Sequence, residues 1–219
     1  DQRWNLFPSF SFGWNMAHES FFAPLTKVIN TFKPRVSWGM LGNQNTDEFY
    51  PFYLTQNVIA NGGSWLMGGV RPTTSGVPGL VSSTLTWEKI YNTNIGFDFG
   101  LLNNRLTGSF EYFIRRTKGM VGPPAEIGAA LGTTLPNTNN AELENKGWDL
   151  NISWRDRIGQ VNYDLGFNLS DNRAKVKKYP NASKAIYQAD GETYAYYDGK
   201  TIGEIWGYET QGIAQSDQQ

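Results

Sequence analysis

The segment 94–114 constrains the fold more than any other part of this 219-residue chain. Large apolar residues alternate with small or polar residues, first over 95–101 and again over 106–114. Because successive side chains of a β-strand point to opposite faces, each half predicts a strand with one apolar and one polar face. Asn103 and Asn104 lie between the halves, and asparagine tolerates the positive φ that a tight turn requires. The segment therefore predicts an antiparallel β-hairpin.

The two asparagines also predict the register of this hairpin. If they are the turn residues, Leu101 pairs with Leu106 and Phe99 pairs with Gly108. The residue numbers of each pair then add up to an odd value. Odd-numbered residues of the first strand, which are the apolar ones, therefore lie beside even-numbered residues of the second strand, which are also apolar. Both apolar sets share one face of the sheet without any adjustment.

The alternation recurs elsewhere, with large and often aromatic residues on one side and mainly Asn, Asp, Ser and Gly on the other. It predicts about seven strands, at residues 7–16, 34–41, 84–101, 105–120, 147–156, 160–172 and 202–213. A soluble β-sandwich alternates too, but its solvent face usually carries Lys, Glu, Thr and Arg. An aromatic apolar face opposite a face of small polar residues favours an all-β, antiparallel transmembrane β-barrel with a wet lumen.

Composition is compatible with this fold and excludes several others. Mean hydropathy is −0.47, and no apolar run approaches the ~18 residues of a membrane-spanning helix. A barrel remains possible because half of each strand and all loops are polar. The net charge of −1 indicates neither a nucleic-acid partner nor a polybasic membrane contact. The absence of cysteine excludes disulfides and Cys-ligated zinc.

The connections between the expected strands alternate between short turns and long loops. The turns are 102–104 and 157–159, and the loops are 42–83, 121–146 and 173–201. Outer-membrane barrels have short periplasmic turns and long extracellular loops, so this alternation predicts a consistent up-and-down order. The remaining connection, 17–33, then lies on the periplasmic side. Leu25, Val28, Ile29 and Phe32 have helical spacing there and predict a short helix.

Six segments form a combination that is typical of one barrel family. They are 7–14 (FPSFSFGW), 37–44 (SWGMLGNQ), 85–89 (LTWEK), 94–113 (NIGFDFGLLNNRLTGSFEYF), 145–154 (NKGWDLNISW) and 202–208 (IGEIWGY). In this order they resemble the C-terminal barrel portion of the SusC/RagA family. The resemblance covers most of the chain.

The resemblance implies a TonB-dependent outer-membrane importer of Bacteroidetes. Such importers work with a SusD-like surface lipoprotein and take up glycans or peptides. A plugged barrel of this kind has about 22 strands. We therefore expect 1–219 to be part of one β-barrel domain, without the plug domain and the remaining strands. TonB would be contacted by parts absent here, and outer-membrane lipid and lipopolysaccharide would surround the barrel, whose cargo is an oligosaccharide or peptide.

The ends of the chain agree with that expectation. Asp1 does not begin a signal peptide, and residues 214–219 contain no closing strand, so both ends are expected to be internal to a longer protein.

On the polar side of the expected strands, eight residues would project into the lumen. They are Asn94, Asp98, Ser109, Glu111, Asp149, Asn151, Asp164 and Asn168. In one interpretation they contact the plug or polar cargo, and in the other they only keep the lumen wet. Their acidic tilt would bias what passes.

On the apolar side, we expect contact with the bilayer. The residues expected to face hydrocarbon include Phe97, Phe99, Ile152 and Leu165. The residues expected in an interfacial aromatic girdle are Trp87, Tyr91, Tyr112 and Trp148. Arg115, Arg116 and Lys118 cluster near an outer strand end, where they either meet lipid phosphates or are simply solvated.

The long loops carry aromatic residues beyond the reach of a girdle. They are Phe49, Tyr50, Phe52, Tyr53, Trp65, Tyr194, Tyr196 and Tyr197. Tyr and Trp rings stack on apolar faces of ligands and are enriched in the cores of interfaces. Lid contact, cargo contact and packing within the loops are all compatible with them.

No catalytic constellation and no cofactor motif is visible. His18 is the only histidine and has no partner for acid–base work, so a structural role is favoured. Asp190, Glu192 and Asp198 are loop carboxylates, which calcium prefers, but their spacing matches no calcium loop. We expect no enzymatic activity, no cofactor and no metal site.

Two alternatives of another class stay open. A non-transporting surface adhesin, or a soluble β-sandwich carbohydrate-binding module, would use the same aromatic loops. Dependence on detergent separates a barrel from a sandwich, because a sandwich needs none.

Overall fold

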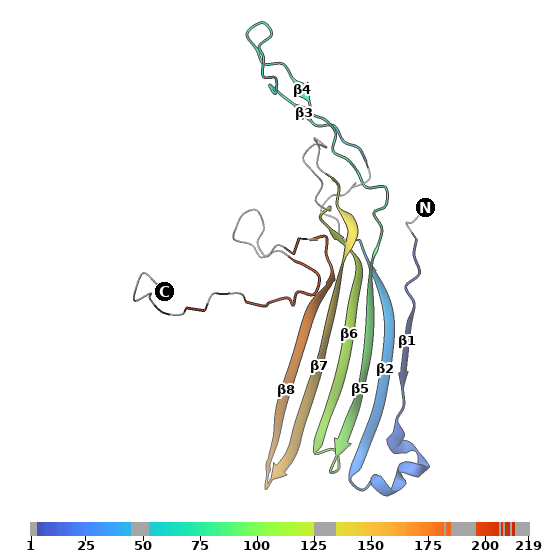
Figure 1. The fold of residues 1–219 in the computed structure, drawn as a ribbon. Coiled ribbons are helices and arrows are strands. Elements are labelled where there is room, and N and C mark those ends of the chain that lie inside the picture. The colour runs from blue at the N-terminus through green and yellow to red at the C-terminus, as the bar shows by residue number, and fades with distance from the viewer. Residues whose placement is uncertain are drawn as a thin grey trace.

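The computed structural model of the protein describes residues 4–44, 53–124, 135–181, 183–184, 196–205, 207, 209–210 and 212. Its centre is a six-stranded antiparallel sheet in the order β1-β2-β5-β6-β7-β8 (Figure 1). The strands are β1 (Ser9–Gly13), β2 (Ile29–Asn43), β5 (Glu88–Leu101), β6 (Leu106–Gly122), β7 (Thr138–Ile158) and β8 (Val161–Lys178). Apart from β1, each contains 14 to 21 residues, which is long for strands of a soluble domain.

The predicted hairpin is confirmed, including its register. Leu101 pairs with Leu106 and Phe99 with Gly108. Asn103 and Asn104 have φ values of 58° and 60°, and the Arg105 amide donates a hydrogen bond of 3.3 Å to the Leu102 carbonyl. Positive φ at both central residues is what a two-residue hairpin turn requires.

The register carries the alternation across the whole sheet. Pro34, Phe97, Phe110, Leu150 and Leu169 are successive neighbours on β2, β5, β6, β7 and β8 and therefore lie on one face. We call this the apolar face and the opposite side the polar face. Aromatic rings follow the apolar face from strand to strand, with Phe97 lying 5.8 Å from both Phe32 and Phe110 between ring centroids.

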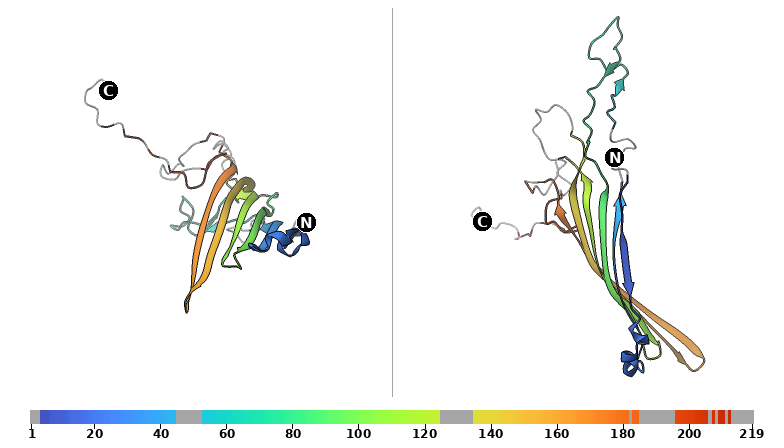
Figure 2. Two further views of the ribbon diagram at one scale, coloured as in Figure 1. Left: turned by 90° about the horizontal axis from the view of Figure 1, so that it is seen from below. Right: turned by 90° about the vertical axis from the view of Figure 1, so that its right-hand side faces the viewer.

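The sheet is a single curved layer (Figure 2). Among the described residues, the buried hydrophobic side chains are Ala17, Phe22, Ala141 and Val176. None of these belongs to the central rows of the apolar face, where Ile95, Leu165 and Phe167 are 57%, 64% and 57% exposed. Within the described part of the chain, no second sheet covers this face, so the sandwich interpretation is not supported.

The short and long connections lie at opposite ends of the sheet, as expected. Figure 1 shows the β5–β6 and β7–β8 turns at the same end as η1 (Met16–His18) and η2 (Ser20–Leu25). The long connections lie at the other end, where one of them contains a small hairpin of β3 (Val58–Ile59) and β4 (Thr74–Ser75). We call these the turn end and the loop end.

The helix predicted within 17–33 is wrong in its position and type. Two short 3-10 helices occupy 16–25, and β2 begins at Ile29 opposite Leu101. Phe32 fits both a helical and a strand period, and pairing with β5 decides in favour of the strand. Its ring stacks on Phe22 of η2 at 6.1 Å.

The strand predicted at 202–213 is also wrong for the residues that the structure describes there. Thr201 forms an isolated antiparallel bridge with Lys175, and the Ile202 amide donates to the Ala174 carbonyl at 2.8 Å. Gly203 then has a φ of 85°, which turns the backbone out of an extended conformation. The chain therefore leaves the edge of β8 after one rung.

Strand boundaries elsewhere differ mainly at the loop end. β7 begins at Thr138 and β8 continues to Lys178, so the predicted loops 121–146 and 173–201 are shorter than expected. Paired rungs such as Glu142 with Lys178 extend the ladder beyond the last regular alternation of the sequence. No helix in the described ranges is long and apolar enough to cross a membrane.

Candidate functional site

The eight residues predicted on the polar side share one face of the sheet by register. Asp98, Ser109, Asn151 and Asn168 form one row across β5, β6, β7 and β8. Glu111 and Asp149 are neighbours in the next row. Asn94 and Asp164 lie further along the same face, towards the loop end and the turn end respectively. The polar face is thus a continuous surface of carboxylates, amides and hydroxyls.

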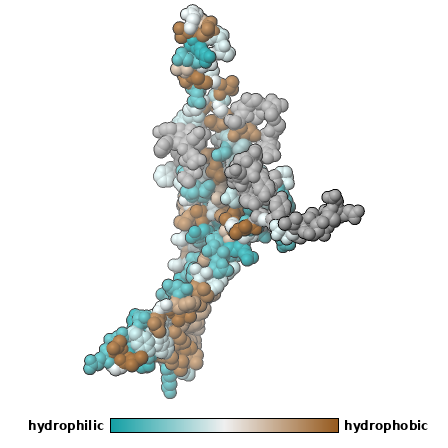
Figure 3. All heavy atoms as spheres, turned by 90° about the vertical axis from the view of Figure 1, so that its left-hand side faces the viewer, coloured by the Kyte–Doolittle hydropathy of each residue, from teal (hydrophilic) through white to brown (hydrophobic). Residues whose placement is uncertain are grey.

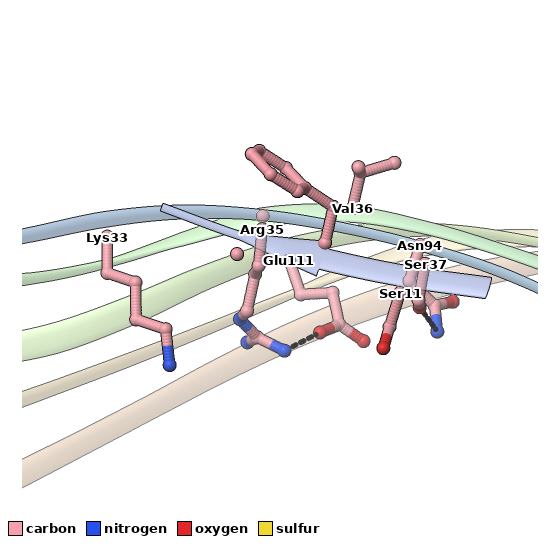
Figure 4. A pocket seen from close by; sticks show the side chains of 10 residues that line it. Ser11, Lys33, Arg35, Val36, Ser37, Asn94 and Glu111 are labelled. Atoms are coloured by element: carbon pink, nitrogen blue, oxygen red, sulfur yellow. Dashed lines mark hydrogen bonds and ion pairs between the residues drawn. The ribbon is translucent and has the colours of Figure 1, made fainter. Parts of the chain in front are cut away.

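Arg35 of β2 organises the centre of this face. Its Nε lies 3.4 Å from Asp98 Oδ1, and its Nη1 lies 2.5 Å from Glu111 Oε2. Figure 4 shows Arg35 directed towards Glu111, while the neighbouring Val36 points to the opposite face. One cation therefore holds carboxylates from two other strands.

Gly96 makes this contact possible. It lies between Arg35 and Glu111 in the same row, on β5. Because Gly96 has no side chain, the Arg35 guanidinium reaches across β5 to β6. A Cβ added to Gly96 would meet the Phe110 carbonyl oxygen and the Glu111 backbone, so even alanine does not fit without a shift.

Arg35 is not among the functional residues predicted from the sequence. Its only local signal is a charge at a polar position of the expected strand 34–41. Its partners lie more than 60 residues away, and only the register of three strands brings them together.

Two hollows lie beside Arg35 on the polar face. The first has a volume of about 260 Å³, and its lining includes Ser11, Lys33 and Asn94. The second has a volume of about 350 Å³, and its lining includes Asp149, Asn151 and Asn168. Both also include Arg35 and Glu111.

The two hollows offer different chemistry. The first contains Lys33, a cation that forms no ion pair with another described residue. The second presents a carboxylate and two amides. Such groups can hold a polar chain or a plug surface by hydrogen bonds.

A second ion pair lies nearer the turn end of the polar face. Arg155 donates from Nε and Nη2 to Asp164 Oδ2 at 2.9 and 2.7 Å, and Ser153 Oγ donates to Asp164 Oδ1 at 2.7 Å. The two charged side chains are 75% and 44% exposed. Solvent screening therefore keeps the contribution of this pair to stability small.

Of the eight loop aromatics, Phe49, Tyr50, Phe52 and Tyr194 lie outside the described residues. Tyr53 and Trp65 are exposed in the long connection before β5. Tyr196 and Tyr197 instead belong to a compact cluster at the loop end.

We call this group the tyrosine cluster: Tyr179, Tyr196, Tyr197, Lys200 and Glu204. The Tyr179 and Tyr196 rings meet edge to face at 5.6 Å, and Lys200 Nζ lies 5.6 and 5.8 Å from the Tyr196 and Tyr197 rings. Tyr197 donates a hydrogen bond of 3.0 Å to Glu204. Burial raises the pKa of Tyr179, and burial with the Glu204 contact raises the pKa of Tyr197.

The candidate metal-ligating and acid–base residues of the sequence are not brought together in the described ranges. No group of three His, Cys, Asp or Glu side chains gathers there. His18 is exposed at the end of η1. Asp198 accepts a hydrogen bond of 2.6 Å from the Tyr179 amide, while Asp190 and Glu192 lie outside the described residues.

A sheet with one polar and one exposed apolar face is consistent with the protein family that the chain matches. A family described as "TonB dependent receptor-like, beta-barrel" matches residues 1–215. The chain belongs to this family. It is therefore part of an outer-membrane β-barrel, which these strands do not close.

Curated relatives agree with this assignment. The chain is 30% identical over 222 residues to TonB-dependent receptor P3 of Formosa agariphila, covering 98% of this chain and 22% of that protein. It is 28% identical over 197 residues to TonB-dependent receptor SusC of Bacteroides thetaiotaomicron, covering 87% of this chain and 19% of that protein. The chain thus spans about a fifth of the length of these relatives.

Solved structures show the same fold. The RagAB peptide transporter matches with a TM-score of 0.64 at 20% identity, covering 79% of this chain and 18% of that one. The RagAB peptide importer in its "open-open" state matches with a TM-score of 0.66 over the same shares.

In a TonB-dependent receptor barrel, the exposed apolar face is the side that contacts membrane lipid. From Tyr91 to Leu101, the outward residues of β5 are apolar except Thr93, a length close to the ~9–11 residues that a tilted strand needs to cross a bilayer. Figure 3 shows hydrophobic side chains gathered over the part of the sheet towards the turn end.

Aromatic side chains border the apolar face at both ends. Tyr91 lies at the loop end of this span, while Tyr112 and Trp148 share the row of Ile95, two rows nearer its middle. At the turn end, Trp154 Nε1 donates to the Tyr163 hydroxyl at 3.4 Å. Trp87, also expected in the girdle, precedes β5 and packs on Phe7 at 5.5 Å. This arrangement is typical of a barrel in a bilayer.

Proposed function

We propose that this chain forms part of the wall of a nutrient importer, which takes up oligosaccharides or peptides by a TonB-dependent mechanism. Energy would reach the importer through segments outside this chain that contact TonB. Family membership, the likeness to SusC and the fold shared with the RagAB peptide transporter support the proposal.

The observation that carries the proposal is the polar face. Its rows of hydrogen-bonding groups run along strands whose other face is apolar and exposed. In a closed barrel these rows line the lumen, where a plug sits or cargo passes. The Arg35 contacts with Asp98 and Glu111 hold the centre of this wall in place, and the two hollows beside them offer separate positions for polar groups.

We further propose that a SusD-like surface lipoprotein closes over the loop end. The tyrosine cluster supports this, because Tyr196 is well exposed at that end while Lys200 and Tyr179 hold it in place. Tyrosine supplies a large contact area with a polar tip, which suits both protein interfaces and sugar faces. The loops 42–83, 121–146 and 173–201 would supply part of the lid contact and part of the cargo site.

The test of import uses intact cells that carry the full-length protein, a deletion strain, and a strain without TonB. Labelled oligosaccharides and labelled peptides are offered separately. We expect uptake of one class to be lost in both mutant strains. Normal uptake of both classes in the deletion strain would overturn the proposal, and surface attachment without uptake would identify an adhesin.

The test of the lid shortens each of the three loops in the full-length protein and measures lipoprotein co-purification and uptake. Tyr196→Ala is the sharpest single change among the described residues, and Phe52→Ala is its counterpart outside them. Arg157→Ala, at the turn end, is the matched control and should leave both readouts unchanged. If all correctly inserted loop variants keep normal co-purification and uptake, the loops are passive.

A further inference from the structure

The apolar face ends in a band of cations at the loop end. We call it the basic band and define it by seven residues. They are Lys89, Arg116, Lys118, Lys146, Arg173, Lys175 and Lys177. The carboxylates on the same face at this level are Glu142, Glu144 and Asp171. The band therefore carries a net positive charge, although the chain as a whole is slightly negative.

The register places this band on the outside of the barrel. Arg116 is paired with Tyr91 on one side and Glu144 on the other, and Lys146 is paired with Ile114. These are positions of the apolar face, in the row of Tyr91 and in the row next to it. Arg115 belongs to the polar face, where its Nε donates to Asn92 Oδ1 at 3.0 Å. The expected cluster of Arg115, Arg116 and Lys118 is thus divided between two faces.

A single buried carboxylate holds the centre of the band. Glu144 is only 4% exposed and forms ion pairs with Arg116, with Lys146 Nζ at 3.2 Å and with Lys177 Nζ at 3.1 Å. Three cations around one carboxylate leave two positive charges without compensation at that point. The band is thus ordered in advance and still attracts a further anion.

Beside this centre lies a hollow of about 260 Å³ in the outer wall. Its lining is Trp38, Tyr91, Thr93, Ile114, Arg116 and Lys118. Trp38, Thr93 and Ile114 share one row towards the apolar part of the face. Arg116 and Lys118 lie in the next rows towards the loop end, and Lys118 Nζ lies 5.7 Å from the Tyr91 ring centroid. The hollow is apolar on its membrane side and cationic on its outer side.

We infer that this hollow binds a phosphorylated glycolipid of the outer leaflet, with a phosphate between Arg116 and Lys118 and an acyl chain against Trp38 and Ile114. The charge of the band matches a phosphate, and its position just beyond the aromatic border matches the depth of lipid headgroups. The apolar side of the hollow lies where the acyl chain of a lipid would lie, and the cationic side lies where its headgroup would lie. The inference rests on membrane insertion and not on transport.

The test uses the full-length receptor in detergent and monophosphoryl lipid A as the probe, with bound lipid counted by native mass spectrometry. Losing two surface cations should weaken binding by about tenfold or more in R116Q/K118Q. R115Q removes a cation from the same strand but from the polar face, and it should bind like the parent protein. Lipid A without phosphate should bind the parent protein as weakly as R116Q/K118Q binds the phosphorylated form.

Three outcomes would overturn the inference: equal loss in R115Q, equal binding of phosphate-free lipid, or equal affinity for inorganic phosphate alone. The last would identify a free-anion site. If R116Q/K118Q fails to insert, K118Q and K146Q replace it, because K118Q leaves all three cations on Glu144 and K146Q leaves two. Uptake by these variants should stay normal, which separates this failure from failure of the import proposal.

Discussion

The two faces of the same sheet are held together in different ways. On the apolar face, Phe32, Phe97 and Phe110 touch ring to ring, yet nearby side chains such as Ile95 remain more than half exposed. On the polar face, Arg35 links β2 to carboxylates of β5 and β6. The apolar face thus needs an external apolar medium, whereas charged side chains of the polar face pair with one another across strands. The alternation therefore describes an environment as well as a secondary structure.

The largest expected effect comes from removing that environment. Within the described part of the chain, β1 and β8 are the edges of the sheet, β8 has a single bridge to Thr201, and no element covers the apolar face. We expect residues 1–219 expressed alone to form no stable soluble monomer. Size-exclusion chromatography and thermal melting without detergent measure this. A sharp melt of a monomer would contradict it, because the apolar face would then need no lipid.

The second effect compares two adjacent residues of β7 that lie on opposite faces. Ile152→Arg places a charge on the apolar face and should cost roughly 2–4 kcal/mol near the bilayer centre. Asn151→Arg should cost much less, because its side chain is on the polar face. Denaturant titration of the full-length protein refolded into lipid measures both. Equal costs would mean that the two faces meet the same medium.

The difference between the two faces could be predicted from the sequence, because it depends only on the two-residue period of the alternation. The hairpin at 94–114 needed only alternation and a turn, and all eight polar residues follow from parity once strands pair. The turn end was harder, since Phe32 fits both the strand and the helical period. At 202–213 the alternation was present, but Gly203 turns the chain away from β8.

The organising contact of the polar face lay beyond sequence reasoning for a different reason. Arg35, Gly96 and Glu111 become neighbours only when the registers of two strand pairs are combined. Gly96 resembled any other small residue of the polar side until its place beneath the Arg35 side chain was known. The division of Arg115 and Arg116 between two faces is likewise a matter of register.

A third effect tests that role of Gly96. Alanine normally stabilises a strand relative to glycine, but here its Cβ would meet the Phe110 carbonyl and force a shift. We expect Gly96→Ala to cost about 1–3 kcal/mol, as overpacking does. Gly166→Ala, on the polar face of β8, is the control, since apart from its chain neighbours no described residue lies within 4 Å of its added Cβ. Equal stability of the two variants by denaturant titration would dismiss the close approach at Gly96.

Arg35→Gln is expected to have the smallest effect on stability. Its main effect is expected on which cargo is taken up. Arg35 and its two partners are partly exposed, so the lost pairing should cost only about 1 kcal/mol. The change nevertheless leaves Asp98 and Glu111 on the polar face without their cation, and Glu111 is the direct neighbour of Asp149. We expect uptake to shift towards cationic cargo, and the shift to shrink at high salt because exposed charges are screened.

The measurement is competition between otherwise identical cationic and anionic peptides or oligosaccharides, at two salt concentrations, with Arg155→Gln as the control at the turn end. An unchanged preference in Arg35→Gln, with normal insertion, would mean that the polar face keeps the lumen wet without selecting what enters it.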